Sequence, residues 1–424
     1  MSILAINAGS SSLKFGLFNE PDCAPLVTGE IDWADGNRDE AQLIVRPRQG
    51  TVVKSRLPLP DSSTAAARAL QAALAAMPRG AEAAAEISAV GHRIVHGGPE
   101  FRDSILIDDT VKAAIGKWSE LAPLHNPPAL KAIQAVEETL PGKPQVAVFD
   151  TTFHAGLPPK AYLYAVPYDW YQRWGIRRFG FHGISHAYCA RRAAEIMGRD
   201  LGPLRLVSCH LGGGCSATAV RGGAAVATTG GFGPMEGLMM GTRCGSIDPG
   251  VLIHLQRQEG LTCKELDRTL NYFSGLLGIS GVSPNLAQVE VAAAQGNKRA
   301  QLAFEMFADQ VRGAIGRLAA TLGGIDALTF TDRVGEGSPA LRAAACAGLG
   351  FMGISLDTQR NAGARPDTDI AAPGSPARIM VIHTEEELMV ARETRRVAGR
   401  QRPGPAGPRR ADSAKVKAAA CLVS

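Results

Sequence analysis

The sequence predicts an α/β protein with two domains. At 424 residues the chain is too long for one hydrophobic core of usual size, and its hydrophobic content of 45% is ordinary for a globular protein. Strand-like apolar runs alternate with alanine-rich helical stretches as far as Phe149, and a second block of the same kind follows Asp150. This alternation is typical of α/β domains.

The first block contains four strand-like runs and one clear helix. The alanine-rich stretch 63–77 is expected to be helical. The runs that we expect to be strands are ILAIN (3–7), LKFGLF (13–18), QLIVRP (42–47) and QVAVFD (145–150).

The second block opens with a predicted strand over 204–211. A long helix is predicted over 300–321, because its large apolar side chains recur at helical spacing, and Gly323 is expected to end it. A strand over 325–331 should then meet a turn that contains Gly335 and Gly337. The next pair, Ser338-Pro339, has the form of an N-cap and a first helical residue.

Two segments share the order strand, small-residue turn, strand: LAINAGSSSLKFGLF (4–18) and LVSCHLGGGCSATAV (206–220). Each could be an ordinary glycine-rich hairpin, or each could cradle phosphate with backbone N–H groups and hydroxyls. One such hairpin from each domain would hold a nucleotide phosphate chain from two sides. Neither these two segments nor the strand and turn over 325–339 contain a G-x-x-x-x-G-K-[ST] or G-x-G-x-x-G motif, so Walker and Rossmann sites are disfavoured there.

Composition argues against several classes of partner. The formal charge of +5 resides in the tail 399–424, with six Lys/Arg and one Asp, so the other 398 residues balance at 39 basic and 39 acidic. We therefore expect no nucleic-acid binding. No segment is long and apolar enough to span a membrane, so we expect a cytoplasmic protein without a membrane partner. The Pro-, Gly- and Arg-rich tail is expected to be disordered, and its C-a-a-X match at 421–424 is too short to indicate prenylation.

Cysteine and histidine spacing indicates neither disulfides nor a metal centre. The eight cysteines are scattered without a C-x-x-C pair, so we expect reduced thiols. The pairs His92/His96 and His182/His186 are spaced four residues apart, but no glutamate stands in H-E-x-x-H register.

Five motifs in order link the chain to one enzyme family: GHRIVHGG (91–98), LHNPP (124–128), FDTTFH (149–154), GFHGISH (180–186) and GLMMGTRCGSIDPG (237–250). With the two hairpins, they make the chain resemble the acetate kinases from residue 3 to about 397. These kinases belong to the group that includes actin, the sugar kinases and the heat-shock chaperone ATPases.

The resemblance implies reversible, Mg²⁺-dependent phosphoryl transfer from ATP to acetate, giving acetyl phosphate and ADP, in a homodimer. It implies two duplicated actin-like (ribonuclease H-like) domains with the active-site cleft between them. We expect residues 1–150 plus 384–398 to form the first domain, residues 151–383 the second, and residues 399–424 the tail.

The resemblance also assigns residues on the acceptor side. A carboxylate acceptor is already ionised at neutral pH, so the chemistry needs relief of anion repulsion more than it needs a strong base. The residues expected to be catalytic are Arg93, Asp150, His182 and Arg243; Arg93, Val95, Leu124, His125, Phe181 and Pro234 are expected to bind acetate, and Asn7 and Glu386 to bind magnesium. Valine at position 95 should favour acetate over propionate, by about 1–3 kcal/mol per methylene.

On the donor side the resemblance assigns four nucleotide-binding segments. They are Ser10, Ser12 and Lys14 in the first hairpin; His210, Leu211, Gly212, Gly213 and Gly214 in the second; Asn285, Leu286 and Ala287; and Arg333, Val334, Gly335, Glu336 and Gly337.

Departures from the family pattern lie mostly on this donor side. Gly213 stands where the family has an asparagine. Asn285 and Ala287 stand where it has the Asp and Arg of Asp-x-Arg. In the family's Gly-Gly-Ile-Gly-Glu-Asn, the first two glycines are Asp332 and Arg333 here, and the final Asn is Gly337. Ser246 also replaces an Asp. We therefore expect weakened nucleotide binding, with pyrophosphate as an alternative donor. An ordinary ATP enzyme with shifted loops, a propionate kinase and a non-catalytic family member are the other readings.

Overall fold

The computed structural model describes residues 1–9, 12–32, 40–58, 62–77 and 84–400. Ser10 and the tail beyond residue 400 lie outside these ranges, so the predictions made for them are not addressed. No helix within the described ranges is long and apolar enough to cross a membrane. The cytoplasmic location stays a prediction.

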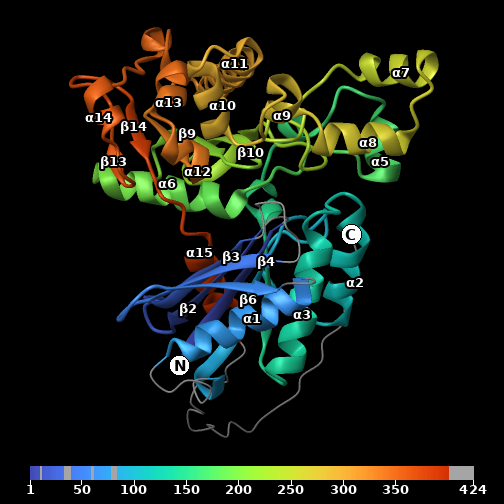
Figure 1. The fold of residues 1–424 in the computed structure, drawn as a ribbon, viewed down its shortest axis with the longest axis vertical. Coiled ribbons are helices and arrows are strands. Elements are labelled where there is room, and N and C mark those ends of the chain that lie inside the picture. The colour runs from blue at the N-terminus through green and yellow to red at the C-terminus, as the bar shows by residue number, and fades with distance from the viewer. Residues whose placement is uncertain (10–11, 33–39, 59–61, 78–83, 401–424) are drawn as a thin grey trace, which may run out of the picture.

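Two mixed sheets organise the chain, one in each half of Figure 1. The first has the order β5-β4-β3-β2-β1-β6-β8-β7. Its strands are β1 Ser2–Ala8, β2 Ser12–Asn19, β3 Pro25–Asp32, β4 Glu40–Pro47, β5 Val53–Pro58, β6 Ile87–Ile94, β7 Ile105–Leu106 and β8 Gln145–Phe149. The second has the order β11-β10-β9-β12-β14-β13. Its strands are β9 Arg205–Leu211, β10 Cys215–Arg221, β11 Ala224–Thr228, β12 Ala327–Thr331, β13 Thr368–Asp369 and β14 Arg378–Val381.

The two sheets repeat one arrangement. In the first, the antiparallel strands β3, β2 and β1 are followed by β6 and β8, which run parallel to β1. In the second, the antiparallel strands β11, β10 and β9 are followed by β12 and β14, which run parallel to β9. Both glycine- and serine-rich segments are therefore hairpins at matching positions, β1–β2 and β9–β10. The repeat agrees with the expected duplication.

Helices cover both sheets. Around the first sheet lie α1 Ser62–Ala75, α2 Asp109–Lys117, η2 Trp118–Glu120, α3 Asn126–Thr139 and α15 Glu386–Gly399. Around the second lie η3 Asp150–His154, α4 Pro159–Tyr162, α5 Tyr168–Trp174, α6 Gly183–Met197, α7 Pro249–Gln258, α8 Cys263–Tyr272, α9 Gly275–Ser280, α10 Leu286–Ala294, α11 Lys298–Leu322, α12 Asp332–Gly337, α13 Pro339–Cys346, η4 Gly350–Met352 and α14 Thr358–Ala362.

The last helix, α15, returns to the first half of the molecule (Figure 1). It packs against β1, β6 and β8, and it also contacts α6. Met389, Val390 and Ala391 of α15 share an apolar cluster with Ile3 and Ala5 of β1. The bounds that we predicted for the two domains stay a prediction.

The second core lies between the sheet and the long helix α11. Phe307, Val311, Ile315 and Leu318 are fully buried there, which explains the helical spacing seen in the sequence. The helix ends at Gly323, whose φ of +71° places its N–H on the carbonyl of Ala320.

One expected element differs from the structure. The glycine turn predicted after the strand 325–331 is a short helix, α12, which begins directly at Asp332. The expected cap is present, because the Ser338 hydroxyl accepts a hydrogen bond from the Leu341 N–H at the start of α13. All seven cysteines within the described ranges are free thiols, as predicted.

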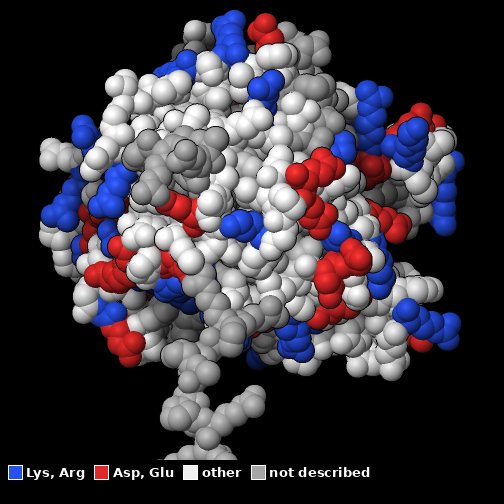
Figure 2. Space-filling view, turned by 90° about the horizontal axis from the view of Figure 1, so that it is seen from below, with Lys and Arg blue, Asp and Glu red and all other residues white. Residues whose placement is uncertain are grey.

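Charged side chains of both signs share the face in Figure 2, where groups of Lys and Arg alternate with groups of Asp and Glu. This mixture matches the balanced charge of the first 398 residues.

Candidate active site

Three neighbouring parallel strands bring polar residues to one edge of the first sheet. Asn7 lies near the end of β1, Arg93 near the end of β6, and Asp150 directly follows β8. Because the carboxyl ends of parallel strands meet at the same edge, the three side chains converge. The N-terminus of α15 adds Glu386 to this edge.

Arg93 and Asp150 form a two-point ion pair. The Arg93 Nε donates to Asp150 Oδ1 at 3.1 Å, and its Nη2 donates to Oδ2 at 2.6 Å. The Asp150 side chain is fully buried, and burial raises the pKa of its carboxyl group against the opposing effect of the guanidinium. This bidentate contact fixes the plane of the guanidinium.

Asn7 and Glu386 complete the group around Arg93. The Arg93 Nη1 donates to Asn7 Oδ1 at 3.0 Å, and Asn7 Nδ2 donates to Glu386 Oε2 at 2.9 Å. Although burial opposes it, the positive charges of Arg93 and His210 lower the pKa of Glu386. Its other oxygen, Oε1, is buried and has no hydrogen-bond partner in the described part of the chain.

The orphaned Oε1 of Glu386 is the feature that fits a divalent cation. Magnesium in phosphoryl-transfer sites is held by one or two carboxylates together with substrate phosphates, so a single free carboxylate oxygen suffices. The described residues contain no cluster of three or more potential metal ligands. The residues present therefore fit an ion that arrives with a phosphate ligand.

His182 stands at the start of α6 in a left-handed conformation, with a φ of +54°. Such a conformation is rare for a residue other than glycine and often marks a functional site. Burial, followed by the nearby charges of His210 and Arg93, lowers the pKa of His182 well below its usual value. The ring is therefore neutral at pH 7 and stacks on His210 with 4.1 Å between the ring centroids.

A buried chain of hydroxyls and imidazoles runs behind His182. Its Nδ1 lies 2.8 Å from Ser216 Oγ, which lies 2.9 Å from His186 Nε2, and His186 Nδ1 lies 2.9 Å from Ser208 Oγ. Two proton arrangements satisfy this chain. Only the one in which Ser216 donates to His182 Nδ1 leaves the proton on Nε2, the atom that faces the second hairpin.

Sequence reasoning missed the roles of Ser208, His186 and Ser216. The signal was present in the alternation of SCHLGGGCSAT, because the register pairs Ser216 with His210 and Thr218 with Ser208. Only the packing of α6 against β9 shows that His186 reaches this polar row.

Arg243 reaches the site from the loop that precedes α7. Its Nη1 donates to the Pro234 carbonyl oxygen, and among the described residues no carboxylate pairs with it. A Cβ at Gly214 would lie 2.6 Å from Arg243 Nη2 and 3.3 Å from His182 Nε2, so only glycine allows both side chains to approach this turn.

The predicted acetate-side residues surround these groups. Val95 and Phe181 are buried in one apolar cluster with Ala122 and Phe179. Burial, assisted by Arg243 and Arg93, lowers the pKa of His125 to about 3, and its buried Nδ1 has no hydrogen-bond partner in the described part of the chain.

Two further acetate-side residues, Leu124 and Pro234, are half-buried. Pro234 is tied to the site through the bond from Arg243 to its carbonyl oxygen.

On the donor side, Lys14 of the first hairpin faces several carboxylates. Partial burial opposes the shift, but Glu387, Glu386 and Asp332 raise the pKa of Lys14. Ser12 shapes the same turn, since its carbonyl oxygen accepts a hydrogen bond from the Gly9 N–H at 2.8 Å.

The second hairpin lies opposite. His210 and Leu211 end β9, and Gly212, Gly213 and Gly214 form the turn. A Cβ at Gly213 would meet no atom within 4 Å, so the position of the missing asparagine opens into free space.

The remaining two donor segments lie on α10 and α12. Asn285 caps α10 by accepting from the Ala287 N–H at 3.0 Å, whereas Leu286 is buried in the core. Within α12, Gly335 is buried, Val334 and Glu336 are half-buried, and Arg333 and Gly337 are exposed.

A further residue holds α12 in place. The side chain of Arg342 is fully buried and donates to the carbonyl oxygens of Gly335 and Glu336 at 2.9 and 2.7 Å. Its Nε donates to Asn361 Oδ1 at 2.8 Å. Sequence reasoning missed this arginine.

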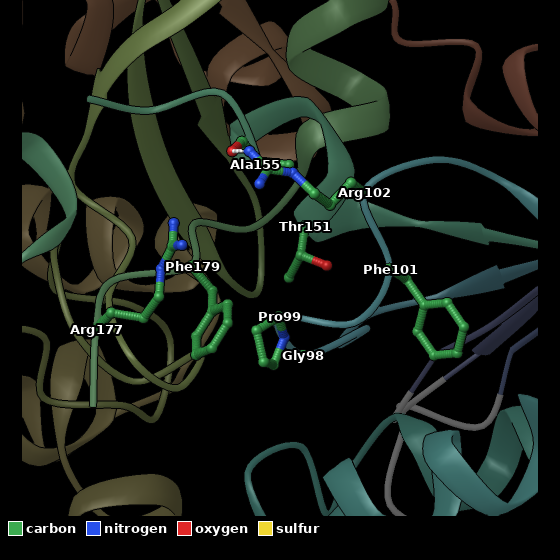
Figure 3. Close-up of a pocket in the computed structure, with 8 residues that line it drawn as sticks. All are labelled: Gly98, Pro99, Phe101, Arg102, Thr151, Ala155, Arg177 and Phe179. Carbon is green, nitrogen blue, oxygen red and sulfur yellow. Dashed lines mark hydrogen bonds between the residues drawn. The ribbon is translucent and has the colours of Figure 1, made fainter. Parts of the chain in front are cut away.

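A small pocket is lined in part by Thr151, the residue that follows Asp150 in the chain (Figure 3). Its volume is about 30 Å³, room for one or two water molecules. Arg102 at its rim donates to the Ala155 carbonyl oxygen at 2.8 Å, the bond drawn in Figure 3. The lining residues are Gly98, Pro99, Phe101, Arg102, Thr151, Ala155, Arg177 and Phe179.

Comparison with known proteins places this site in a family. The model of the acetokinase family matches residues 2–392. The chain belongs to the acetokinase family. An acetate kinase of Trichormus variabilis is 48% identical to this family member over 404 residues, which span 93% of this chain and 98% of that protein.

Solved acetokinase structures share the fold. The acetate kinase of Porphyromonas gingivalis superposes with a TM-score of 0.82 at 39% identity, and a propionate kinase of Francisella tularensis with 0.84 at 35% identity. Each comparison covers 93% of this chain and 99% of the other. The predicted fold class, with two duplicated domains of the actin type, is confirmed. The roles assigned to individual site residues stay predictions.

Proposed function

We propose that this acetokinase is an acetate kinase that transfers a phosphoryl group reversibly between ATP and acetate. One observation carries the proposal: the Arg243 guanidinium has no carboxylate partner among the described residues and lies across Gly214 from the neutral His182. A guanidinium without a counter-ion in such a site is a receptor for a planar anion. The family's acetate kinases support acetate as the acceptor.

The reaction at neutral pH needs no proton transfer. An acetate oxygen forms a bond to the γ-phosphorus of ATP while the bond from that phosphorus to the β-bridging oxygen breaks, and the total charge is unchanged. Arg243 and the remaining N–H groups of Arg93 relieve repulsion between the two anions, and the Nε2–H of His182 donates to the transferring phosphoryl group. Asp150 acts by holding Arg93 in its plane.

Magnesium would be held by Glu386 and by the nucleotide phosphates. When bound, it neutralises phosphate charge. Asn7 cannot offer its oxygen freely, because that atom accepts from Arg93, so its part is to orient Glu386 through its amide group.

The acceptor pocket favours a small acid. Val95 and Phe181 are buried in one apolar cluster, so an added methylene must displace them. Propionate is the alternative acceptor, since a propionate kinase is among the similar structures. One methylene changes the binding free energy by only about 1–3 kcal/mol, so Val95 would not exclude propionate completely.

The activity is tested by trapping acyl phosphate as the hydroxamate. Purified protein is incubated with Mg²⁺ and either ATP or pyrophosphate, with acetate or propionate as acceptor. We expect acetyl phosphate with ATP, and a lower kcat/KM for propionate. If acetyl phosphate forms only with pyrophosphate, then pyrophosphate and not ATP is the phosphoryl donor. If it forms with neither donor, the kinase function is refuted.

The enzyme is also proposed to be a homodimer that pairs through its second half. Several large apolar side chains on α5, α7 and α8 are exposed, and α7 and α8 project from the upper half in Figure 1. They are Tyr168, Trp170, Trp174, Val251, Ile253, Tyr272 and, directly after α8, Phe273. Light scattering should give a dimer that Trp174→Ser weakens, whereas Phe351→Ser, at another exposed apolar site, should not; a monomeric parent protein would refute the dimer.

A further inference from the structure

Asp332 holds an unusual place at the donor side. It follows β12 directly and has a φ of +65°, a left-handed conformation in which glycine, the family's residue here, is relaxed. An ideal Cβ built on Gly212 would lie 1.7 Å from Asp332 Oδ2. The carboxylate therefore lies directly on the backbone of the second hairpin, in space that only the glycine at position 212 leaves open.

The carboxylate is paired with the cations of the site. Asp332 Oδ2 lies 3.3 Å from His210 Nε2, and His210 is buried. Against the effect of burial, Asp332 raises the pKa of His210, while His210 and Lys14 lower the pKa of Asp332. Both shifts favour the ionised form of the pair, an imidazolium against a carboxylate.

The partners of Asp332 are those that a phosphate group would use. A cationic imidazole, a lysine from the facing hairpin and a glycine backbone form the kind of cradle that binds phosphate oxygens. The other charged groups that bear on Lys14 are carboxylates, chiefly Glu386 and Glu387. Asp332 adds one more negative charge beside Lys14 before any nucleotide enters.

We propose that Asp332 is a specificity determinant of the donor site, because its carboxylate occupies the place of a donor phosphate group beside His210. The inference rests on the proposed function only in taking the two hairpins as the donor site. A nucleoside polyphosphate that binds here must either displace the Asp332 carboxylate from His210 or bind beside it, where the negative charge of Asp332 repels the phosphate groups. The nucleoside part of the donor does not meet this carboxylate.

The proposal refines the expectation drawn from the sequence, which gave Asp332 and Arg333 equal weight. The Arg333 side chain is exposed, whereas that of Asp332 points into the hairpin. The weakening of the donor therefore depends on one charge and not on the loss of two glycines.

Titration calorimetry on the full-length protein tests this without any acceptor. Asp332→Asn keeps the size of the side chain and tolerates the same backbone conformation, so it removes only the charge. We expect Asp332→Asn to lower the Kd of Mg·ATP at least about tenfold, which corresponds to about 1.4 kcal/mol, and to leave the Kd of adenosine unchanged. Asp332→Gly, which also relaxes the backbone, should tighten Mg·ATP at least as much.

Asp367 provides a matched control. It has a φ of +64°, and its carboxylate pairs with Arg192 away from both hairpins. Asp367→Asn should leave the Kd of Mg·ATP unchanged.

Two results would overturn the proposal. An unchanged Kd for Mg·ATP in Asp332→Asn would show that the charge of Asp332 does not affect donor binding. An equal decrease in the Kd of adenosine would show that the substitution acts through the conformation of the loop. Because the titrations contain no acetate, a protein that fails to phosphorylate acetate but shows the expected tightening would refute the proposed function alone.

Discussion

The guanidinium of Arg93 and the carboxylate of Asp150 meet through two parallel hydrogen bonds, Nε to Oδ1 at 3.1 Å and Nη2 to Oδ2 at 2.6 Å. Asp150 is fully buried, so the pair sits out of water at the point where the ends of β6 and β8 converge. Asp150 thereby fixes the direction of the remaining N–H groups of Arg93. It can do so without touching the substrate itself.

Asp150→Asn should lower kcat/KM for acetate by about 100-fold, because a carboxamide accepts only one of the two bonds and leaves Arg93 free to turn. It should also lower the free energy of unfolding by about 3 kcal/mol, since a buried charge loses its partner. Steady-state kinetics and urea denaturation check both values. Asp326→Asn breaks a similar two-point pair with Arg205 far more exposed to water, and it should leave kcat/KM unchanged. Wild-type kcat/KM in Asp150→Asn would contradict the aiming role.

Arg243→Ala should reduce kcat by about 100- to 1,000-fold, the usual effect of removing a donor that stabilises developing negative charge. Arg243→Lys should recover little, because an ammonium group cannot offer two parallel donors. Arg299→Ala serves as the control, since Arg299 is exposed and its guanidinium donates to the carbonyl oxygens of Gly278 and Ile279. If Arg243→Ala lowers thermal stability but keeps kcat, the residue is structural.

Ser216→Ala should lower kcat about tenfold, because His182 loses the hydroxyl that fixes the proton on its Nε2. The pH profile gives a sharper test. Burial and neighbouring charges lower the pKa of His182, so the neutral, active ring persists at pH 7 and kcat falls only as pH drops through that lowered pKa. Without the Ser216 donor the neutral form is less favoured, and the acid limb should move to higher pH.

Thr218→Val is the control for this chain of hydrogen bonds. Thr218 lies on β10, two residues after Ser216, and its hydroxyl bonds to His154 of η3 and not to His182. The acid limb of the kcat profile of Thr218→Val should match that of the wild type. An acid limb that moves in both Ser216→Ala and Thr218→Val, or in neither, would refute the assignment of the His182 proton to Nε2.

Glu386→Gln should raise the Mg²⁺ concentration needed for half-maximal activity by about 10- to 100-fold. The carboxylate oxygen that lacks a partner would become part of a neutral amide, a weaker ligand for a hard cation. Glu385→Gln, one residue earlier and half-buried, should leave the Mg²⁺ requirement unchanged. Equal Mg²⁺ curves for Glu386→Gln and the wild type would place the metal elsewhere.

Much of the fold could be predicted from the sequence because its signals are local. The apolar runs that became β1, β2, β4 and β8 are bounded by small or polar residues, and the period of α11 follows its buried face. The expected turn at Gly335 failed for a local reason as well, since residues 332–337 contain no proline and close into one short helix.

The site was harder to predict because its contacts join distant segments. The strand-end position of Asp150 and the motifs around Arg93 and His182 marked candidates, but no spacing rule connects Asn7 to Glu386, 379 residues away. The same reason hid the contact of Asp332 with Gly212, which depends on the parallel pairing of β12 with β9.

The central claim is direct phosphoryl transfer from ATP to acetate, and ³¹P NMR of the purified protein with Mg·ATP and acetate measures it most directly. We predict that acetyl phosphate and ADP accumulate in equal amounts, and that Arg243→Ala slows the formation of both by about 100- to 1,000-fold. ADP without acetyl phosphate, or acetyl phosphate formation that survives in Arg243→Ala at the wild-type rate, would contradict the account.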